Sequence, residues 1–442
     1  ALAWRAETLH AIEAGQGDLA EIAHLVADAI VEAHLATMLR LYVEYDVLPR
    51  ESEILHLKFW ASAFALLKER KAIYLESEGK NAGCWVMPGL SEEGKVIVRS
   101  DGTVTYVGKD IAYHLWKFGL LGQDFGYERF YAYPDGHPVW RTSMATAPGA
   151  DAPHFGKVAV AYAVIDTRQS YLQNVVRAAF HALGYHQQAA NLHHFDYAFV
   201  GLSLRCVKEM GLKLNPPEGE AEEGAQGYVI LSGRKGLGIK ADDLIQQLIE
   251  KAAEEVRSRE MTKDPAEQNV YATMIAVGAL RYFLLKFTRR SIIAFDFKEA
   301  LAFEGETGPY LQYSVVRARN IFRKFEESHP DFDAAALAEQ LPPDQLKNFL
   351  GGEKGRSFWE MTLLAAQLEV SVDQAIEGED PAVVAKYAFR LAQAFNNFYH
   401  HHHILNEPDP VRQRLLLYLV QIASQTLANA LDLLGIEVPE KM

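Results

Sequence analysis

The chain has 442 residues, of which 49% are hydrophobic and 23% charged, so it can bury two or three ordinary cores and is too apolar to be disordered. Its formal net charge of −14 argues against a protein that coats nucleic acid, although a local basic face on an acidic body can still bind RNA. The two cysteines, Cys84 and Cys206, are too few for a disulfide scaffold or a zinc site and indicate a reducing compartment.

The N-terminal region shows no targeting signal. No apolar run reaches the roughly 18 residues that span a bilayer, and the chain enters a helical pattern without a charged and then apolar leader. We therefore expect a cytoplasmic protein with no membrane association. The first residue is alanine and not methionine, which suggests that Ala1 is not the natural start.

Two helices are predicted at the start of the chain. Apolar residues recur every three or four positions over residues 19–41, which predicts a surface helix with one buried stripe, and a second helix is expected over 54–69. The polar side chains here are expected to be solvated or capping and not catalytic: Glu32, His34, Asp46 and Glu51.

A sheet is predicted next. Residues 84–87, 96–99 and 103–106 have the composition of strands separated by Pro-Gly and Asp-Gly breaks, and residues 109–118 turn helical. Tyr106 and Asp110 then lie at a strand-to-helix junction, where α/β sheets place their ligands.

A strand, polar loop and helix follow. After a further strand over 130–133, residues 158–165 read as a buried parallel strand, and Asp166 to Ser170 end it and cap a helix that continues through 184. A polar loop at the carboxyl end of such a strand is where a doubly wound sheet binds substrate. For His193 and His194 we favour a structural role over ligation.

A glycine-rich basic loop, Ser232-Gly233-Arg234-Lys235-Gly236, precedes a helix predicted over 241–257. Its glycines let the backbone approach a ligand closely, and Arg234 and Lys235 can neutralise phosphate charge. By itself such a loop is a weak signal, and its position between a sheet and a helix strengthens it.

From residue 263 onward long helices replace the strands, which predicts a separate helical domain. Within it, Tyr310, Tyr313 and Arg317 follow a Thr-Gly-Pro helix start and share a helix face. Two aromatic rings beside a guanidinium can stack on unpaired bases, but ordinary packing aromatics beside a surface arginine fit as well.

Two explanations fit the four consecutive histidines, His400 to His403: a metal site and a purification tag. Neighbouring residues on a helix point in different directions and cannot all ligate one ion. We therefore expect no metal site.

Several segments, in this order, resemble class I arginyl-tRNA synthetases. They are Tyr106 to Asp110, Val164 to Tyr171, Ser232 to Gly236, Gly305 to Tyr313, Phe395 to His400 and Gly435 to Met442. The resemblance implies α/β plus all-α architecture, with a partial Rossmann-like class I catalytic domain followed by a helical-bundle anticodon-binding domain. The expected boundaries are 1–90 for a helical insert region, 91–262 for the catalytic half and 263–442 for the anticodon-binding domain.

The resemblance also assigns roles to individual residues. It assigns arginine binding to Tyr106, Asp110 and Gln169. The Asp110 carboxylate suits this role, because it can accept two parallel hydrogen bonds from the planar guanidinium. It makes Ser232, Arg234 and Lys235 catalytic, and it assigns ATP to Asp166, Ser232, Gly233 and Lys235. It assigns tRNA to Tyr310, Tyr313 and Arg317. Arginine, ATP with Mg²⁺ and the tRNA for arginine are the implied partners of a monomer without a tightly bound cofactor.

The chain departs from the family pattern in three places. Ile230 stands where the basic loop usually begins with lysine, and Asp166 to Gln169 differ from the more common Gly-Ala-Asp-His. The His-x-Gly-His motif that the family uses to hold ATP is absent. We therefore interpret the chain as the later part of an arginine–tRNA ligase and expect it not to form arginyl-adenylate alone. A non-catalytic tRNA-binding paralogue and a different α/β nucleotide-binding enzyme remain alternatives.

Overall fold

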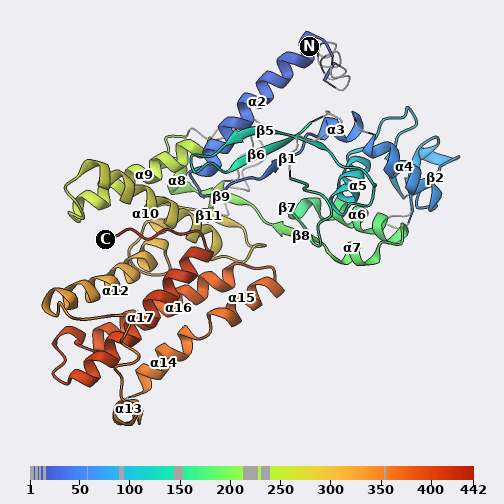
Figure 1. Cartoon of the computed structure of the whole chain (residues 1–442). Helices are drawn as coiled ribbons and strands as arrows, with labels where there is room; N and C mark the ends of the chain where they lie inside the picture. Colours follow the sequence, from blue (N-terminus) through green and yellow to red (C-terminus); the bar gives the residue numbers. More distant parts are fainter. Residues whose placement is uncertain are drawn as a thin grey trace. The chain divides into compact units, whose positions relative to one another are not determined.

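The computed structural model describes residues 16–56, 58–88, 94–143, 153–212, 227–229, 239–352 and 355–442, together with positions 4, 8, 11 and 12. The chain forms two compact units, Ala1–Tyr197 and Ala198–Met442 (Figure 1). The first is α/β, and the second joins a small sheet to a helical bundle. The domain boundaries predicted at 90/91 and 262/263 stay predictions.

The described residues of the first unit form three small sheets. In one of them β1 (Val47–Leu48) pairs in parallel with β6 (Pro138–Ser143), which pairs antiparallel with β5 (Gly126–Ala132). The second sheet is antiparallel and consists of β2 (Tyr74–Leu75), β3 (Trp85–Met87) and β4 (Lys95–Val98). The third is a parallel pair, β7 (Ala161–Asp166) and β8 (Leu192–Tyr197).

The helices of the first unit are α2 (Asp18–Leu39), α3 (Glu51–His56), α4 (Phe59–Glu69), α5 (Tyr106–Lys117), α6 (Ser170–Ala182) and α7 (His186–Ala190), with 3₁₀ turns η1 (Gly79–Asn81) and η2 (Thr167–Gln169). Helix α5 lies at the centre of their core, because it packs against α3, α4 and α6. It contributes the fully buried Ile111 and Leu115, which join Phe59 and Phe180 in one cluster.

Helix α2 confirms the predicted helix, but the predicted buried stripe is wrong. Ile22, Leu25 and Ile30 are exposed, and only Ala20 and Leu35 are buried. Among the described helices this one alone has the length and composition of a membrane span, with a mean hydropathy of 1.4. Helices of soluble proteins can have the same length and composition, so these two properties do not assign α2 to a membrane.

The strand predicted over 103–106 is wrong. Val104 forms only an isolated bridge with Val98, and α5 begins at Tyr106, three residues earlier than expected. The Thr105 hydroxyl donates to the main-chain oxygens of Val96 and Ile97, next to the point where the chain turns into the helix.

Strand β7 confirms the predicted parallel strand, but not its burial on both faces. Tyr162 and Val164 point to an exposed face, while Ala161 and Ala163 are buried. The ring of His193 on β8 stacks on Tyr162 with 4.8 Å between centroids.

The second unit begins with a three-stranded sheet. Strand β9 (Val200–Ser203) lies between antiparallel β10 (Tyr228–Val229) and parallel β11 (Ile293–Phe295). Around it are α8 (Leu204–Glu209), α9 (Ala241–Ser258), α10 (Pro265–Leu285) and α11 (Phe297–Ala300). Helix α9 confirms the predicted helix after the basic loop and packs against α10.

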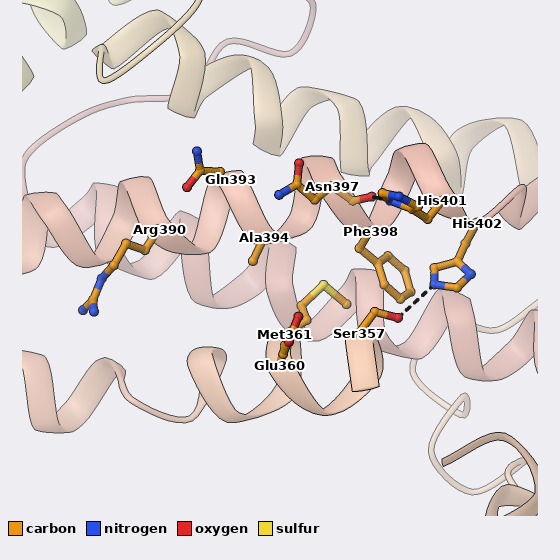
Figure 2. A pocket seen from close by; sticks show the side chains of 10 residues that line it. All are labelled: Ser357, Glu360, Met361, Arg390, Gln393, Ala394, Asn397, Phe398, His401 and His402. Atoms are coloured by element: carbon orange, nitrogen blue, oxygen red, sulfur yellow. Dashed lines mark hydrogen bonds between the residues drawn. The ribbon is translucent and has the colours of Figure 1, made fainter. Parts of the chain in front are cut away.

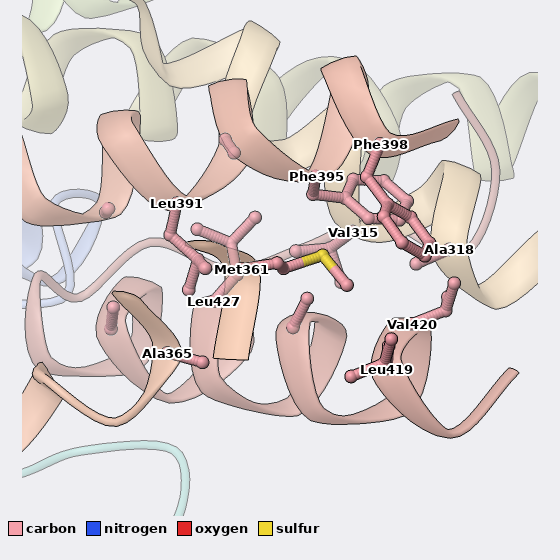
Figure 3. Packing of buried hydrophobic residues seen from close by; sticks show 14 of the residues in the cluster. Val315, Ala318, Met361, Ala365, Leu391, Phe395, Phe398, Leu419, Val420 and Leu427 are labelled. Carbon is pink, nitrogen blue, oxygen red and sulfur yellow. The ribbon is translucent and has the colours of Figure 1, made fainter. Parts of the chain in front are cut away.

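The rest of this unit is helical: α12 (Gly308–Ser328), α13 (Pro343–Leu350), α14 (Arg356–Ala365), α15 (Leu368–Glu377), α16 (Ala382–His401), η6 (Ile404–Asn406) and α17 (Pro410–Leu433). A groove opens beside α14 and α16 (Figure 2). Behind it, α12, α14, α16 and α17 share one apolar core in which Val315, Met361, Leu391 and Leu427 interdigitate (Figure 3).

Candidate functional site

Helix α5 carries the two residues predicted to bind arginine in its first two turns. Tyr106 is the first helical residue and is 75% exposed, while Asp110 is half-buried. A spacing of four places them on the same helix face. Among the described residues, the Asp110 carboxylate has no hydrogen-bond or ion-pair partner. The structure therefore brings the predicted pair together and leaves its carboxylate available to a ligand.

Burial and the negative charge of Glu51 raise the pKa of the Asp110 carboxyl to about 6, against the opposing charges of Lys117 and Lys109. A carboxylate that is removed from water without a partner is costly in the folded state. A bound cation would remove that cost, because it supplies the missing charge and hydrogen bonds.

The later turns of α5 continue the polar face. Burial lowers the pKa of His114 to about 3, and its Nδ1 atom is buried without a hydrogen-bond partner among the described residues. The Lys117 ammonium lies 4.6 Å from the centre of the Tyr113 ring, and burial lowers its pKa. Asp110 thus shares its helix with a neutral imidazole and a half-buried ammonium.

The loop after β7 has the predicted strand, loop and helix arrangement. The Asp166 carboxylate accepts from the Arg168 backbone nitrogen at 2.8 Å and from its Nε at 2.9 Å, and these bonds lower the Asp166 pKa. Gln169 is exposed and precedes α6. Although α5 packs against α6, no hydrogen bond between described residues joins Tyr106 or Asp110 to this loop. The structure therefore packs the two helices together without a hydrogen bond between these predicted residues.

The basic loop lies outside the described residues, so Ser232, Gly233, Arg234 and Lys235 stay predictions. Its flanks are described: β10 ends at Val229 and α9 begins at Ala241. Asp242 and Asp243 lie in the first turn of α9.

The three residues predicted to bind tRNA lie on α12 but have different surroundings. The Tyr310 ring is partly buried against the bundle core, 5.8 Å from Phe389. The Arg317 guanidinium lies 4.6 Å from the Tyr313 ring and 5.2 Å from the Tyr399 ring, and it donates to the Asn396 side-chain oxygen. Only Tyr313 and Arg317 therefore form one cluster, and α16 completes it.

The helix start before this cluster is explained by close packing. The Thr307 hydroxyl accepts from the Tyr310 backbone nitrogen and donates to the Ala302 oxygen. A Cβ atom on Gly308 would lie 2.4 Å from the Gly278 carbonyl oxygen on α10, so only glycine fits where these helices meet. The Thr-Gly-Pro pattern thus sets the packing of α12 on α10.

The groove beside α14 and α16 has a volume of about 660 Å³ and was not predicted from the sequence (Figure 2). Its α16 side consists mostly of exposed polar residues at helical spacing: Arg390, Gln393, Asn397 and His401. The helical spacing of these polar residues was the feature of the sequence from which this face of the groove could be predicted. Amides and a guanidinium are groups that contact bases and phosphates in RNA.

One end of the groove carries a serine and a histidine within hydrogen-bond distance, with 3.1 Å between the Ser357 hydroxyl and His402 Nε2 (Figure 2). Arg412 Nη2 lies 3.3 Å from His402 Nδ1. Because a guanidinium can only donate, Nδ1 must accept and Nε2 must carry the proton. His402 cannot then remove the serine proton, so the pair is not a nucleophile and base.

The other histidines of this run do not form a cluster. In the part of the chain that the structure describes, no three His, Cys, Asp or Glu side chains come together as a metal site requires. His401 Nδ1 lies 2.7 Å from the Asn397 carbonyl oxygen, one turn back on α16.

Comparison with known proteins identifies the family. Residues 311–442 match the model of the DALR anticodon binding domain. The arginine–tRNA ligases of Thermococcus kodakarensis and Deinococcus radiodurans are 33% and 32% identical to the chain over 99% of its length. The solved arginyl-tRNA synthetase of Thermus thermophilus has a TM-score of 0.77 and 31% identity, again over 99% of the chain. The chain belongs to the arginyl-tRNA synthetase family.

Coverage of these family members is partial. The chain spans 64% of the Thermococcus protein, 67% of the Deinococcus protein and 66% of the Thermus structure. The predicted α/β plus all-α architecture is confirmed. The match to the anticodon-binding model begins within α12, inside the segment Gly305 to Tyr313 that resembles the family.

Proposed function

We propose that the chain works as an arginine–tRNA ligase, forming arginyl-adenylate from arginine and ATP and transferring the arginyl group to the 3′ end of its tRNA. The observation that carries this proposal is Asp110, a half-buried carboxylate without a protein partner in the described residues. A guanidinium would fill this site with two parallel hydrogen bonds. Tyr106, one helical turn earlier, and Gln169 are the other proposed arginine contacts.

For ATP and its accompanying Mg²⁺ we propose contacts from Asp166, Ser232, Gly233 and Lys235. Ser232, Arg234 and Lys235 are the proposed catalytic residues. The two cations would stabilise negative charge that develops on the phosphates, and the glycine would let the backbone approach them.

For tRNA we propose the surface of the helical bundle. The exposed polar row of α16, from Arg390 to His401, offers donors to bases and phosphates. The cluster of Tyr313 and Arg317 offers a ring and a guanidinium, and Tyr310 contributes the part of its ring that the core leaves open. We propose further that the chain recognises the arginine-specific tRNA and that it is a cytoplasmic monomer.

Arginine binding by the whole chain tests the proposal. Isothermal titration should show binding of arginine to the parent, and Asp110→Asn should weaken it by two orders of magnitude or more, in line with roughly 3 kcal/mol for an unpaired buried charge. Asp18→Asn, at an exposed position at the start of α2, is the matched control. Equal affinity of the parent and Asp110→Asn would contradict the assignment. Binding of tRNA without arginine would favour the non-catalytic paralogue.

A further inference from the structure

Helices α6 and α7 are joined by a tight turn with one defined geometry. The backbone nitrogen of Tyr185 donates to the Phe180 carbonyl oxygen at 2.9 Å, and that of Gly184 donates to the His181 oxygen at 3.0 Å. Gly184 has a φ of 85°, in the left-handed region that glycine adopts without strain. These features form a Schellman motif, and the contact between the rings of Tyr185 and Phe180 is the apolar contact that often accompanies it.

The turn places two exposed imidazoles against each other. His181 lies in the last turn of α6 and His186 is the first residue of α7, and their Nδ1 atoms are 3.0 Å apart. Leu183 between them and Ala189 in α7 are buried in the core of the first unit, which fixes both helices. In the protein alone, one Nδ1 carries a proton and donates it to the lone pair of the other.

The separation of the two nitrogens matches that of neighbouring ligands on a metal ion. With bonds of about 2.0–2.1 Å from imidazole nitrogen, a separation of 3.0 Å corresponds to an angle of about 95° at the metal. Tetrahedral Zn²⁺ requires about 109° and therefore about 3.3 Å between the nitrogens. Cu²⁺ and Ni²⁺ accept imidazole in tetragonal geometries, in which neighbouring ligands lie at right angles. The pair therefore suits Cu²⁺ and Ni²⁺ better than Zn²⁺.

We propose that His181 and His186 form a two-histidine site for Cu²⁺ or Ni²⁺, separate from the residues proposed to bind arginine, ATP and tRNA. On binding, the proton of the donor Nδ1 moves to Nε2 of the same ring, so both rings stay neutral and both Nδ1 lone pairs reach the metal. Water fills the other positions, since no third His, Cys, Asp or Glu side chain joins the pair in the described residues. The bound ion is exchangeable, and the site does not depend on ligase activity.

Copper titration of the whole chain tests the site. Because the nearby run of histidines in the sequence can also bind metal, the test uses a background in which three exposed members are replaced: His400→Asn, His401→Asn and His403→Asn. In this background His181→Gln and His186→Gln should each weaken Cu²⁺ binding at least about tenfold, because the second ligand of a preformed pair acts at a high effective concentration. The background chain should bind Cu²⁺ more tightly than Ni²⁺.

Electron paramagnetic resonance at substoichiometric Cu²⁺ counts the nitrogen ligands. The background chain should show two equatorial imidazole nitrogens, and each single variant should show one. His34→Gln, at an exposed position of α2, is the matched control and should still show two. Affinity equal to that of the background chain in both His181→Gln and His186→Gln, or a single nitrogen in the background chain, would overturn the site and leave the pair as an ordinary hydrogen bond.

Discussion

The side-chain amide nitrogen of Gln312 donates to the main-chain oxygen of Glu437 at 2.6 Å and to that of Met274 at 3.0 Å. This one residue on α12 therefore links the C-terminal segment to α10. Arg281 on α10 adds a second link, because its Nε donates to the Leu434 oxygen at 2.8 Å. Two of the segments that carry the family resemblance, Gly305 to Tyr313 and Gly435 to Met442, thus meet in the fold.

Gln312→Leu should lower the free energy of unfolding by about 2–3 kcal/mol, because two carbonyl oxygens lose their donor while the residue stays similar in size. Chemical denaturation measures this loss, and hydrogen exchange should show faster opening of residues 435–442. Gln374→Leu, on the exposed surface of α15, is the control. Unchanged stability and exchange would show that the amide does not hold the C-terminal segment.

Asp110→Asn should stabilise the protein above pH 6 while removing arginine binding. The folded-state pKa of about 6 lies above the ordinary 3.8, so the folded protein binds more protons and stability falls as pH rises from about 4 to 6. Asp110→Asn lacks this loss of stability. Its free energy of unfolding should be about 1–3 kcal/mol higher than that of the parent at pH 7 and equal to it below pH 4. Denaturation at both pH values measures it. A less stable variant at pH 7 would mean that Asp110 has a structural partner.

His402→Gln should flatten the acid dependence of stability. Burial and the positive charge of Arg412 lower the His402 pKa to about 4, from an ordinary 6.5. The unfolded chain therefore binds more protons between these values, and stability present above pH 6.5 is lost as pH falls toward 4. Over this pH range the free energy of unfolding should fall by about 1–3 kcal/mol more in the parent than in His402→Gln. His400→Gln, at an exposed position of α16, should follow the parent, and parallel curves for all three proteins would refute the prediction.

Tyr313→Ala and Arg317→Ala should weaken tRNA binding beyond what lost folding explains. Base stacking is worth roughly 1–3 kcal/mol per ring, and only the arginine effect should grow at low salt. Arg317→Ala should also lower the melting temperature, because it breaks the contact with Asn396. Arg390→Ala is the comparison, since this exposed residue should affect binding alone. Loss of tRNA affinity only in proportion to lost folding would make Tyr313 and Arg317 packing residues.

Sequence by itself determined the features that depend on local periodicity and on short motifs. The helix predicted over 109–118 corresponds to α5, and the Thr-Gly-Pro pattern predicted the start of α12 at Gly308. The strand and helix on either side of Asp166 were also predicted. Each of these depends on residues within one or two turns of each other, whose preferences act before any distant contact forms.

Tertiary structure decided which of these residues have partners. Periodicity predicted that one side of α2 is buried, yet burial depends on what packs there, and Ile22 and Leu25 are exposed. Arg317 lies on the predicted face of α12, but its contacts with Asn396 and Tyr399 come from α16. Glu51 and Lys109 form an ion pair across 58 residues of sequence. No local pattern encodes such pairs, because each depends on how two separate helices pack.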